Sequence, residues 1–337
     1  MTTWDKIIGH RWAIDVLRSA LLYDRVGHAY LITGPAQIGR TTLARTFAQA
    51  LNCTAVDPAE RPCGICRACT LISADKHPDV RRIVGETSGR GKVTLKIDQI
   101  RELNHVLNLT AAEARYKVAT IEQFDTANAS AANAFLKTLE EPPHNVILLL
   151  TATDAETLLP TIPSRCRTIA LRPVPATEIQ EALETGWQVD TEQASLLAHL
   201  ADGRIGWAIQ AALNRTLLEE RAEQLDLLAQ TFSQNLVERF AVADKLAQDP
   251  ENLPALLKIW LSWWRDLALL SAGQQDVDSL THIDRQQELI EIAERLPAGT
   301  AVAALQQTEQ SLQYLKSNAN TRLVMENLLL RYPHLDN

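Results

Sequence analysis

The chain has 337 residues, a formal net charge of −8, and a composition that is 46% apolar and 22% charged. This length exceeds one ordinary core and predicts a globular protein of roughly two domains. The apolar runs, such as 146–150, are far shorter than the about 20 residues that cross a bilayer, so we expect no membrane segment. The first residues lack the basic-then-apolar layout of a secretory signal, which predicts a cytoplasmic protein.

The acidic charge also bears on nucleic acids. Non-specific DNA binding needs clustered lysines and arginines, and a net acidic chain does not readily supply them. If the protein acts on DNA, we therefore expect it to do so through partner subunits. The same acidity is equally consistent with a contribution to solubility alone.

The first half of the chain alternates short β-rich segments with helical patterns, which is typical of a parallel sheet with crossover helices. The expected strands cover residues 29–33, 80–84, 118–121, 146–151 and 168–171. Leu43, Phe47 and Leu51 recur every four residues and predict a helix with one apolar face. A second helix is expected over 130–141, where Pro142 ends it. Its apolar face comprises Ala132, Phe135, Leu136 and Leu139.

Strand signals end near Pro173, and Pro175 adds to the sign of a boundary. A short helical segment follows to about Leu213, and the remainder is helical almost throughout. Apolar residues recur there at helical spacing, and three of them are tryptophans: Trp260, Trp263 and Trp264. Tryptophans so spaced are more typical of a core or a subunit interface than of a platform for stacking bases.

A glycine-rich segment, Gly34-Pro-Ala-Gln-Ile-Gly39-Arg40-Thr41, lies between the expected strand at 29–33 and the helix that carries Leu43. This is the context of a phosphate-binding P-loop, in which backbone N–H groups and a helix N-terminus face a phosphate. Arg40 stands where such loops usually carry lysine, and a forked guanidinium does not replace a compact ammonium. The segment predicts either a weakened nucleotide site or a P-loop fold that is not used. Thr41 remains suited to bind Mg²⁺.

The acidic motif expected after the third strand is altered as well. Hydrolytic P-loop enzymes usually place Asp-Glu there, one residue for magnesium and one to polarise water. Here the two positions are Glu122 and Gln123. Glu122 can still reach a metal through water, but the neutral Gln123 cannot act as a general base. Asp125 is displaced by two residues, and we expect a cap or a surface charge there. Both motifs argue against hydrolysis of ATP.

Four of the five cysteines, Cys53, Cys63, Cys66 and Cys69, have the spacing C-x9-C-x2-C-x2-C. Disulfides are disfavoured in a cytosolic chain, so this spacing predicts a metal site. Four thiolates satisfy tetrahedral Zn²⁺ and leave no position for water, which makes the predicted role structural. The alternative is a set of unligated core thiols. Cys166 is far away and is expected to be a small buried hydrophobe.

These motifs occur in a defined order. The glycine loop and the cysteines are followed by His77-Pro78-Asp79, the segments 97–101 and 133–143, and Ser164-Arg165-Cys166. This series resembles the bacterial clamp-loader AAA+ subunits of DNA polymerase III, which include the gamma/tau and delta-prime types. The resemblance covers residues 1–213, and segment 317–326 resembles the end of the collar domain in delta-prime chains.

The resemblance implies a fold of three parts. The first is an α/β P-loop AAA+ domain over residues 1–171, with a five-stranded parallel sheet and a zinc-binding insert at 53–69. A small helical lid domain over 172–213 and an all-α collar domain over 214–337 follow. Family members form a five-subunit spiral that opens a sliding clamp and closes it around primed DNA. The implied partners are gamma/tau and delta subunits and the clamp, with DNA reached through the complex.

The resemblance also implies roles for residues. Arg165, in the Ser-Arg-Cys motif, would be donated across a subunit interface to ATP held by a neighbour. A planar, permanently charged guanidinium suits the charge on a transferring phosphoryl group. Thr153 matches the position of a polar residue that senses phosphate. The candidate nucleotide-binding residues are Gly34, Gly39, Arg40, Thr41, Thr42, Glu122 and Thr153.

Several features favour the delta-prime type over the ATPase motor. Both nucleotide motifs are altered, and Gly206 stands where motor chains carry a phosphate-sensing arginine, with Arg204 out of register by two. The end at Asn337, without a long tail, also suits this type. The alternatives are a gamma/tau-like motor and a zinc-dependent nucleic-acid-binding protein. The second would need a basic surface around the cysteines, and only Arg61, Arg67 and Lys76 lie nearby in the sequence.

Overall fold

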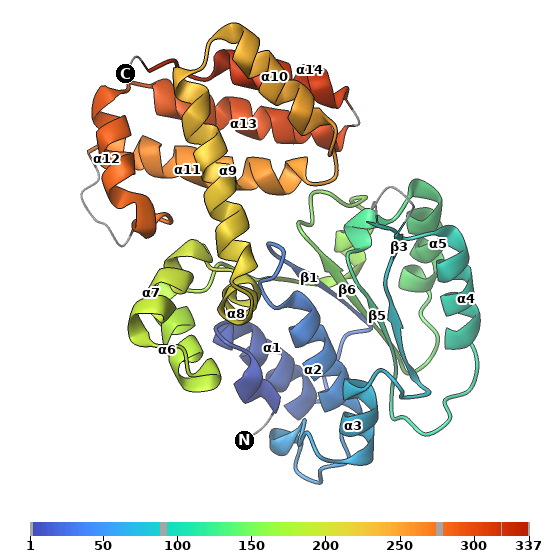
Figure 1. The fold of residues 1–337 in the computed structure, drawn as a ribbon. Helices are drawn as coiled ribbons and strands as arrows, with labels where there is room; N and C mark the ends of the chain where they lie inside the picture. The colour runs from blue at the N-terminus through green and yellow to red at the C-terminus, as the bar shows by residue number, and fades with distance from the viewer. Residues whose placement is uncertain (1–2, 88–92, 274–278, 318, 336–337) are drawn as a thin grey trace. The chain divides into compact units, whose positions relative to one another are not determined.

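The computed structural model describes residues 3–87, 93–273, 279–317 and 319–335 (Figure 1). Residue 318, in the expected collar segment 317–326, lies outside these ranges. The chain forms two compact units, one of residues 1–182 with 203–207 and the other of residues 183–202 with 208–337. The division at 171 and 213 that the sequence suggests stays a prediction.

The first unit is built on a five-stranded sheet with the strand order β2-β5-β6-β1-β7, in which every neighbouring pair is parallel. The strands are β1 (Ala29–Thr33), β2 (Val80–Ile83), β5 (Lys117–Ile121), β6 (Val146–Ala152) and β7 (Arg167–Ala170). The predicted five-stranded parallel sheet is therefore confirmed, with each strand within one residue of its expected ends. The short strands β3 (Glu86–Thr87) and β4 (Val93–Thr94) pair antiparallel. They were not predicted, because two residues are too few to show a period.

Helices cover both faces of the sheet, because successive strand residues point to opposite sides. Tyr30 and Ile32 face a core shared with α1 (Arg11–Leu22) and α2 (Arg40–Asn52). Leu31, between them, faces a second core. That core is shared with α4 (Ile97–Leu107) and α5 (Ala129–Glu140). The three central strands β1, β5 and β6 are fully buried, as expected for a sheet covered on both sides. The edge strands β2 and β7 are largely exposed or half-buried.

Both predicted helices are confirmed. Leu43, Phe47 and Leu51 are buried on α2. Helix α5 begins after Asn128, whose side chain accepts a hydrogen bond from the Ala131 backbone N–H, and it ends one residue before the predicted boundary. The other short helices of this unit are η1 (Thr3–Lys6), η2 (Pro58–Glu60), α3 (Arg67–Ser73), η3 (Phe124–Thr126) and η4 (Pro163–Arg165).

The regular secondary structure among the described residues of the second unit is all helical, in agreement with the prediction of an almost wholly helical part. Helices α6 (Ala176–Trp187) and α8 (Ile205–Leu213) contain residues of both units. The remaining helices are α7 (Thr191–Leu200), α9 (Thr216–Ser233), α10 (Leu236–Ala247), α11 (Leu253–Ser271), η6 (Ile283–Arg285), α12 (Gln286–Arg295), α13 (Thr300–Lys316) and α14 (Thr321–Arg331). None of the described helices combines the length and apolarity that crossing a bilayer requires.

The three tryptophans of α11 form the centre of this helical core. Trp260, Trp263 and Trp264 are each at most 1% exposed. The Trp260 indole N–H donates a hydrogen bond of 2.9 Å to the Gln224 carbonyl. The ring centroids of Trp264 and Phe232 are 5.4 Å apart. Rings packed in this way cannot stack on bases, so the core interpretation is confirmed.

Candidate functional site

The glycine loop joins the carboxyl end of β1 to the N-terminus of α2, as predicted. Gly34 has a φ of 144°, and an added Cβ there would lie 2.9 Å from the Leu171 carbonyl oxygen. Gly39, with a φ of 108°, immediately precedes α2. Both positions therefore require glycine. The Gly34 N–H is already used, because it donates a hydrogen bond of 3.1 Å to the Thr153 carbonyl.

The carbonyl groups of the loop are also held in place. The Gly206 N–H donates to the Gln37 carbonyl at 2.8 Å, and His10 Nε2 donates to the Ile38 carbonyl at 3.0 Å. A Cβ at position 206 would lie 2.7 Å from the Gln37 oxygen. A side chain therefore does not fit where motor chains carry arginine. The Arg204 guanidinium instead lies over the Trp207 ring, 5.8 Å from its centroid.

Arg40 is inside the protein, with 7% of its surface exposed. Burial lowers the pKa of its guanidinium, and attraction to Asp125 partly offsets that effect. Within the described part of the chain, Arg40 Nη1 and Asp125 Oδ1 are buried without hydrogen-bond partners. Asp125 Oδ2 accepts hydrogen bonds from the Thr153 hydroxyl at 2.5 Å and its backbone N–H at 3.2 Å. The expectation of a helix cap or a surface charge at Asp125 is therefore wrong, because this partly buried carboxylate binds a residue 28 positions further along the chain.

Two groups expected to meet phosphate are consequently engaged within the chain. The charge of Arg40 is balanced in part by Asp125, and the Thr153 hydroxyl is donated to the same carboxylate. No sequence pattern indicates this arrangement, because Asp125 lies two residues beyond the position at which a catalytic carboxylate is expected. Thr42, the last candidate of the loop, is exposed on α2.

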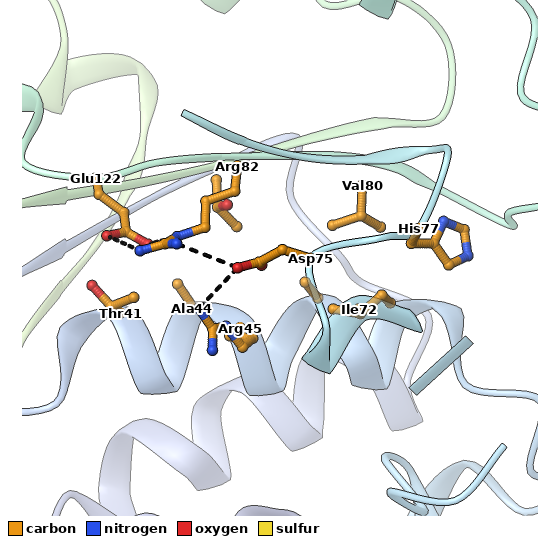
Figure 2. Close-up of a pocket in the computed structure, with 11 residues that line it drawn as sticks. Thr41, Ala44, Arg45, Ile72, Asp75, His77, Val80, Arg82 and Glu122 are labelled. Carbon is orange, nitrogen blue, oxygen red and sulfur yellow. Dashed lines mark hydrogen bonds and ion pairs between the residues drawn. The ribbon is translucent and has the colours of Figure 1, made fainter. Parts of the chain in front are cut away.

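A small pocket lies beside the loop and contains both predicted metal-binding residues, Thr41 and Glu122 (Figure 2). The Arg82 guanidinium binds Glu122 through two atoms, with Nε 2.6 Å from Oε1 and Nη2 3.1 Å from Oε2. Asp75 Oδ2 lies 3.3 Å from Arg82 Nη1 and 3.6 Å from Arg45 Nη2. The four charged side chains form a continuous series of ion pairs above Thr41.

The His77-Pro78-Asp79 motif has a structural role next to this pocket. The Asp79 carboxylate accepts three backbone N–H hydrogen bonds, each of 2.8 to 2.9 Å, from residues 112–114. His77 Nδ1 accepts the Asp79 backbone N–H at 3.1 Å. Burial by itself raises the pKa of Asp79, but the three N–H groups outweigh it and hold the pKa below its ordinary value.

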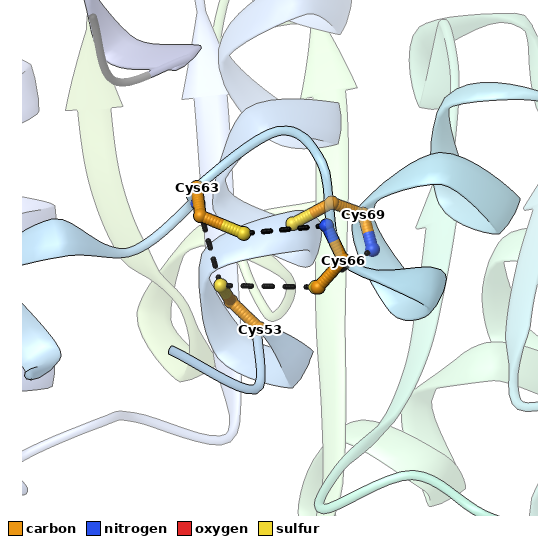
Figure 3. A group of neighbouring side chains, drawn as sticks. All are labelled: Cys53, Cys63, Cys66 and Cys69. Carbon is orange, nitrogen blue, oxygen red and sulfur yellow. Dashed lines mark hydrogen bonds between the residues drawn. The ribbon is translucent and has the colours of Figure 1, made fainter. Parts of the chain in front are cut away.

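The four clustered cysteines come together as predicted (Figure 3). The sulfur atoms of Cys53, Cys63, Cys66 and Cys69 all lie within 4.8 Å of one another. Four sulfurs bound to one zinc at about 2.3 Å would lie about 3.8 Å apart, so the group fits a tetrahedral ion with a small contraction. The distant Cys166 is partly buried, and burial raises its pKa to about 12.

Backbone donors around the sulfurs suit thiolate ligands. The N–H of Cys63 lies 3.3 Å from the Cys53 sulfur, and the N–H of Cys66 lies 3.4 Å from the Cys63 sulfur. Cys66 caps the N-terminus of α3. Burial raises the pKa of both Cys53 and Cys69, so a bound cation would favour their thiolate forms. The cluster is therefore a candidate site for structural zinc.

Arg165 is the last residue of η4 and lies two residues before the start of β7. Its Nη2 lies 2.7 Å from Glu140 Oε1, and its Nη1 donates to the Thr161 carbonyl at 2.9 Å. The side chain is one-third exposed, at 33%. It lies apart from the glycine loop, since it precedes a strand whereas the loop follows one.

Comparison with known proteins places the chain in a family. Residues 9–175 match the family model described as DNA polymerase III, delta subunit, and residues 215–334 match the model of the C-terminal part of that subunit. Subunit delta' of DNA polymerase III from Pseudomonas aeruginosa is 30% identical over 91% of this chain and 92% of that protein. Subunit tau from Bacillus subtilis is 26% identical over 96% of this chain, which spans 60% of the tau protein.

Among solved structures, a gamma subunit-related protein from Thermotoga maritima aligns with 95% of this chain and 97% of its own length, at 18% identity and a TM-score of 0.42. The two family models and the Pseudomonas relative define the class as a subunit of DNA polymerase III. The chain belongs to the clamp-loader family of this polymerase that includes the delta-prime, gamma and tau subunits.

Proposed function

We propose that this chain is a delta-prime-type subunit of the replicative clamp loader and assists ATP-dependent loading of the sliding clamp onto primed DNA. It acts as a scaffold and donates Arg165 to ATP bound by a neighbouring subunit. Its partners are gamma/tau and delta subunits, the clamp, and DNA through the complex. We propose a cytoplasmic location, a lid at 172–213 and a collar at 214–337.

The position of Arg165 relative to the sheet carries this proposal. β1 and β7 are parallel, with Tyr30 opposite Arg167 and Thr33 opposite Ala170. The glycine loop follows the carboxyl end of β1, whereas Arg165 precedes the amino end of β7. At about 3.3 Å per residue, the two ends of these strands are roughly 10–15 Å apart. Arg165 thus lies at the opposite end of these strands from the glycine loop of its own chain, which suits a residue used in trans.

The state of the chain's own loop supports the same role. Arg40 is buried beside Asp125, and Gln123 is a neutral residue where hydrolysis needs a base. We propose that ATP and Mg²⁺ bind here weakly or not at all. The four cysteines hold a structural Zn²⁺ that stabilises residues 53–69.

The decisive experiment compares Arg165→Ala with wild type in a complex reconstituted with gamma/tau, delta, clamp and primed DNA. We expect the variant to fold and assemble normally. It should slow ATP hydrolysis at the neighbouring subunit's site, to which Arg165 is donated, by about 10³–10⁵-fold. Arg101→Ala is the matched control, because Arg101 is also paired with a carboxylate on the surface, at 3.3 Å from Asp98. Single-turnover hydrolysis at full wild-type rate in the Arg165→Ala complex would refute the donor role.

A further inference from the structure

The pocket beside the glycine loop does not suit a magnesium ion, although it contains the residue types that bind one. A metal at this position would need the Thr41 hydroxyl and an oxygen of Glu122, directly or through water. Both oxygens of Glu122 instead accept hydrogen bonds from Arg82, at 2.6 and 3.1 Å. A bidentate pair of this kind is among the stronger ion pairs that arginine makes.

The sheet directs Arg82 to this place. Residues two apart on a strand share a face, so Val80 and Arg82 both line the pocket while Arg81 points to the other side. The partner strand β5 contributes Thr120, which is opposite Arg82 in the register, and then Glu122. The pairing therefore places the arginine over the acidic motif.

The surrounding charges are balanced without a metal. Arg82 also contacts Asp75 at 3.3 Å, and Asp75 contacts Arg45 at 3.6 Å, so two arginines face two carboxylates. The Glu122 side chain is 13% exposed, which leaves it little water as an alternative partner. Hydrogen bonding to Glu122 raises the pKa of Arg82 further, so the guanidinium remains charged. A divalent cation entering here would meet a fixed positive charge.

We propose that Arg82 takes the place of the divalent cation, so that this pocket excludes Mg²⁺ while Arg82 is present and binds one when Arg82 is removed. The metal would then be held by Thr41 and Glu122, with Asp75 nearby. This inference rests on the proposed role of the chain as a subunit that does not hydrolyse ATP. It adds a physical reason why Mg²⁺ does not bind, namely that the Arg82 guanidinium occupies the position of the metal.

The test is a titration of the full chain with Mn²⁺, a spectroscopic substitute for Mg²⁺, followed by electron paramagnetic resonance. We expect Arg82→Ser to gain saturable binding of about one Mn²⁺ per chain, at least about tenfold tighter than any binding by wild type. Adding Glu122→Gln to Arg82→Ser should remove the gained binding. Arg82 is 39% exposed on an edge strand, so its replacement is compatible with folding. Circular dichroism checks this, and Arg82→Gln serves as a second variant.

Arg81→Ser is the matched control, because it removes the same charge from the neighbouring position on the opposite side of β2. It should leave Mn²⁺ binding at the wild-type level. Two results would overturn the proposal. One is Glu122-dependent Mn²⁺ binding by wild type as tight as that of Arg82→Ser, and the other is no gain in folded Arg82 variants. The titration uses the chain alone, so its failure is distinct from that of the Arg165 experiment in the assembled complex.

Discussion

Arg165 and Glu140 form an ion pair at the amino edge of the sheet, with Nη2 2.7 Å from Oε1. Glu140 is the last residue of α5, and Arg165 is the last residue of η4. The other terminal nitrogen of the guanidinium donates to the Thr161 carbonyl. In the isolated chain, the residue proposed to act on a neighbour's ATP is therefore already paired. For Arg165 to contact phosphate, at least the bond to Glu140 has to be exchanged.

The first prediction concerns this exchange. Glu140 is 50% exposed and Arg165 33%, so the pair contributes about 0–1 kcal/mol to stability. Glu140→Gln should therefore change the free energy of unfolding by less than about 1 kcal/mol. In the reconstituted complex it should raise the hydrolysis rate by up to about fivefold, because the guanidinium is released for phosphate. Glu141→Gln, one residue further on, should leave the rate unchanged. A slower rate with Glu140→Gln would mean that Glu140 positions Arg165 rather than competing for it.

The second prediction concerns the cysteines. Protein purified under reducing conditions should contain about one zinc per chain, because four thiolates complete a tetrahedral site. Removing the metal with a chelator should cost about 2 kcal/mol or more, which corresponds to a fall in melting temperature of roughly 4–8 °C. Cys69→Ser should lose the zinc in the same way, whereas Cys166→Ser, outside the cluster, should retain it. A metal-free protein with unchanged melting temperature would instead support unligated core thiols.

The third prediction is the dependence of stability on pH through Asp79. The pKa of this carboxyl is held below its ordinary value in the folded chain. The ionised form therefore contributes stability above the ordinary pKa of about 3.9, and this contribution is lost as the pH falls through the lower, folded value. At pH 7, Asp79→Asn should lower the free energy of unfolding by about 1–3 kcal/mol, because charged acceptors of three N–H groups are lost.

The measurement is chemical denaturation of wild type and Asp79→Asn over a series of pH values. The difference between them should narrow as the pH is lowered towards about 3. His77, which contacts the Asp79 backbone, has a pKa lowered by burial, and both proteins share it. Asp98→Asn is a suitable control, since the Asp98 side chain is 84% exposed. A constant difference across this range would show that the hydrogen bonds do not depend on the charge of Asp79.

Much of the fold of the first unit was predictable, because the residues that form apolar patterns in the sequence are the ones buried in the structure. Strands 29–33 and 146–151 are apolar runs between turn signals, and both faces of the sheet are covered. The helix stripe of Leu43, Phe47 and Leu51 is buried as its spacing indicates. The paired strands at 86–87 and 93–94 were missed because two residues are too few to show a period.

The sequence by itself also determined which residues surround the candidate sites. The cysteine spacing brings four sulfurs together, because three of them lie on one short turn and helix. Gly34 and Gly39 occupy backbone conformations that other residues rarely adopt. Because the loop needs glycine at these positions, their spacing in the sequence identifies it.

Only the tertiary structure decided what the charged residues do. Arg82 meets Glu122 across 40 positions of sequence, and Arg165 meets Glu140 across 25. Asp125 meets Thr153 across 28. Contacts between residues so far apart in the sequence depend on the order of strands in the sheet and on the face to which each side chain points. Neither can be predicted from the local spacing of residues. The charge balance around the glycine loop is therefore a property of the folded sheet.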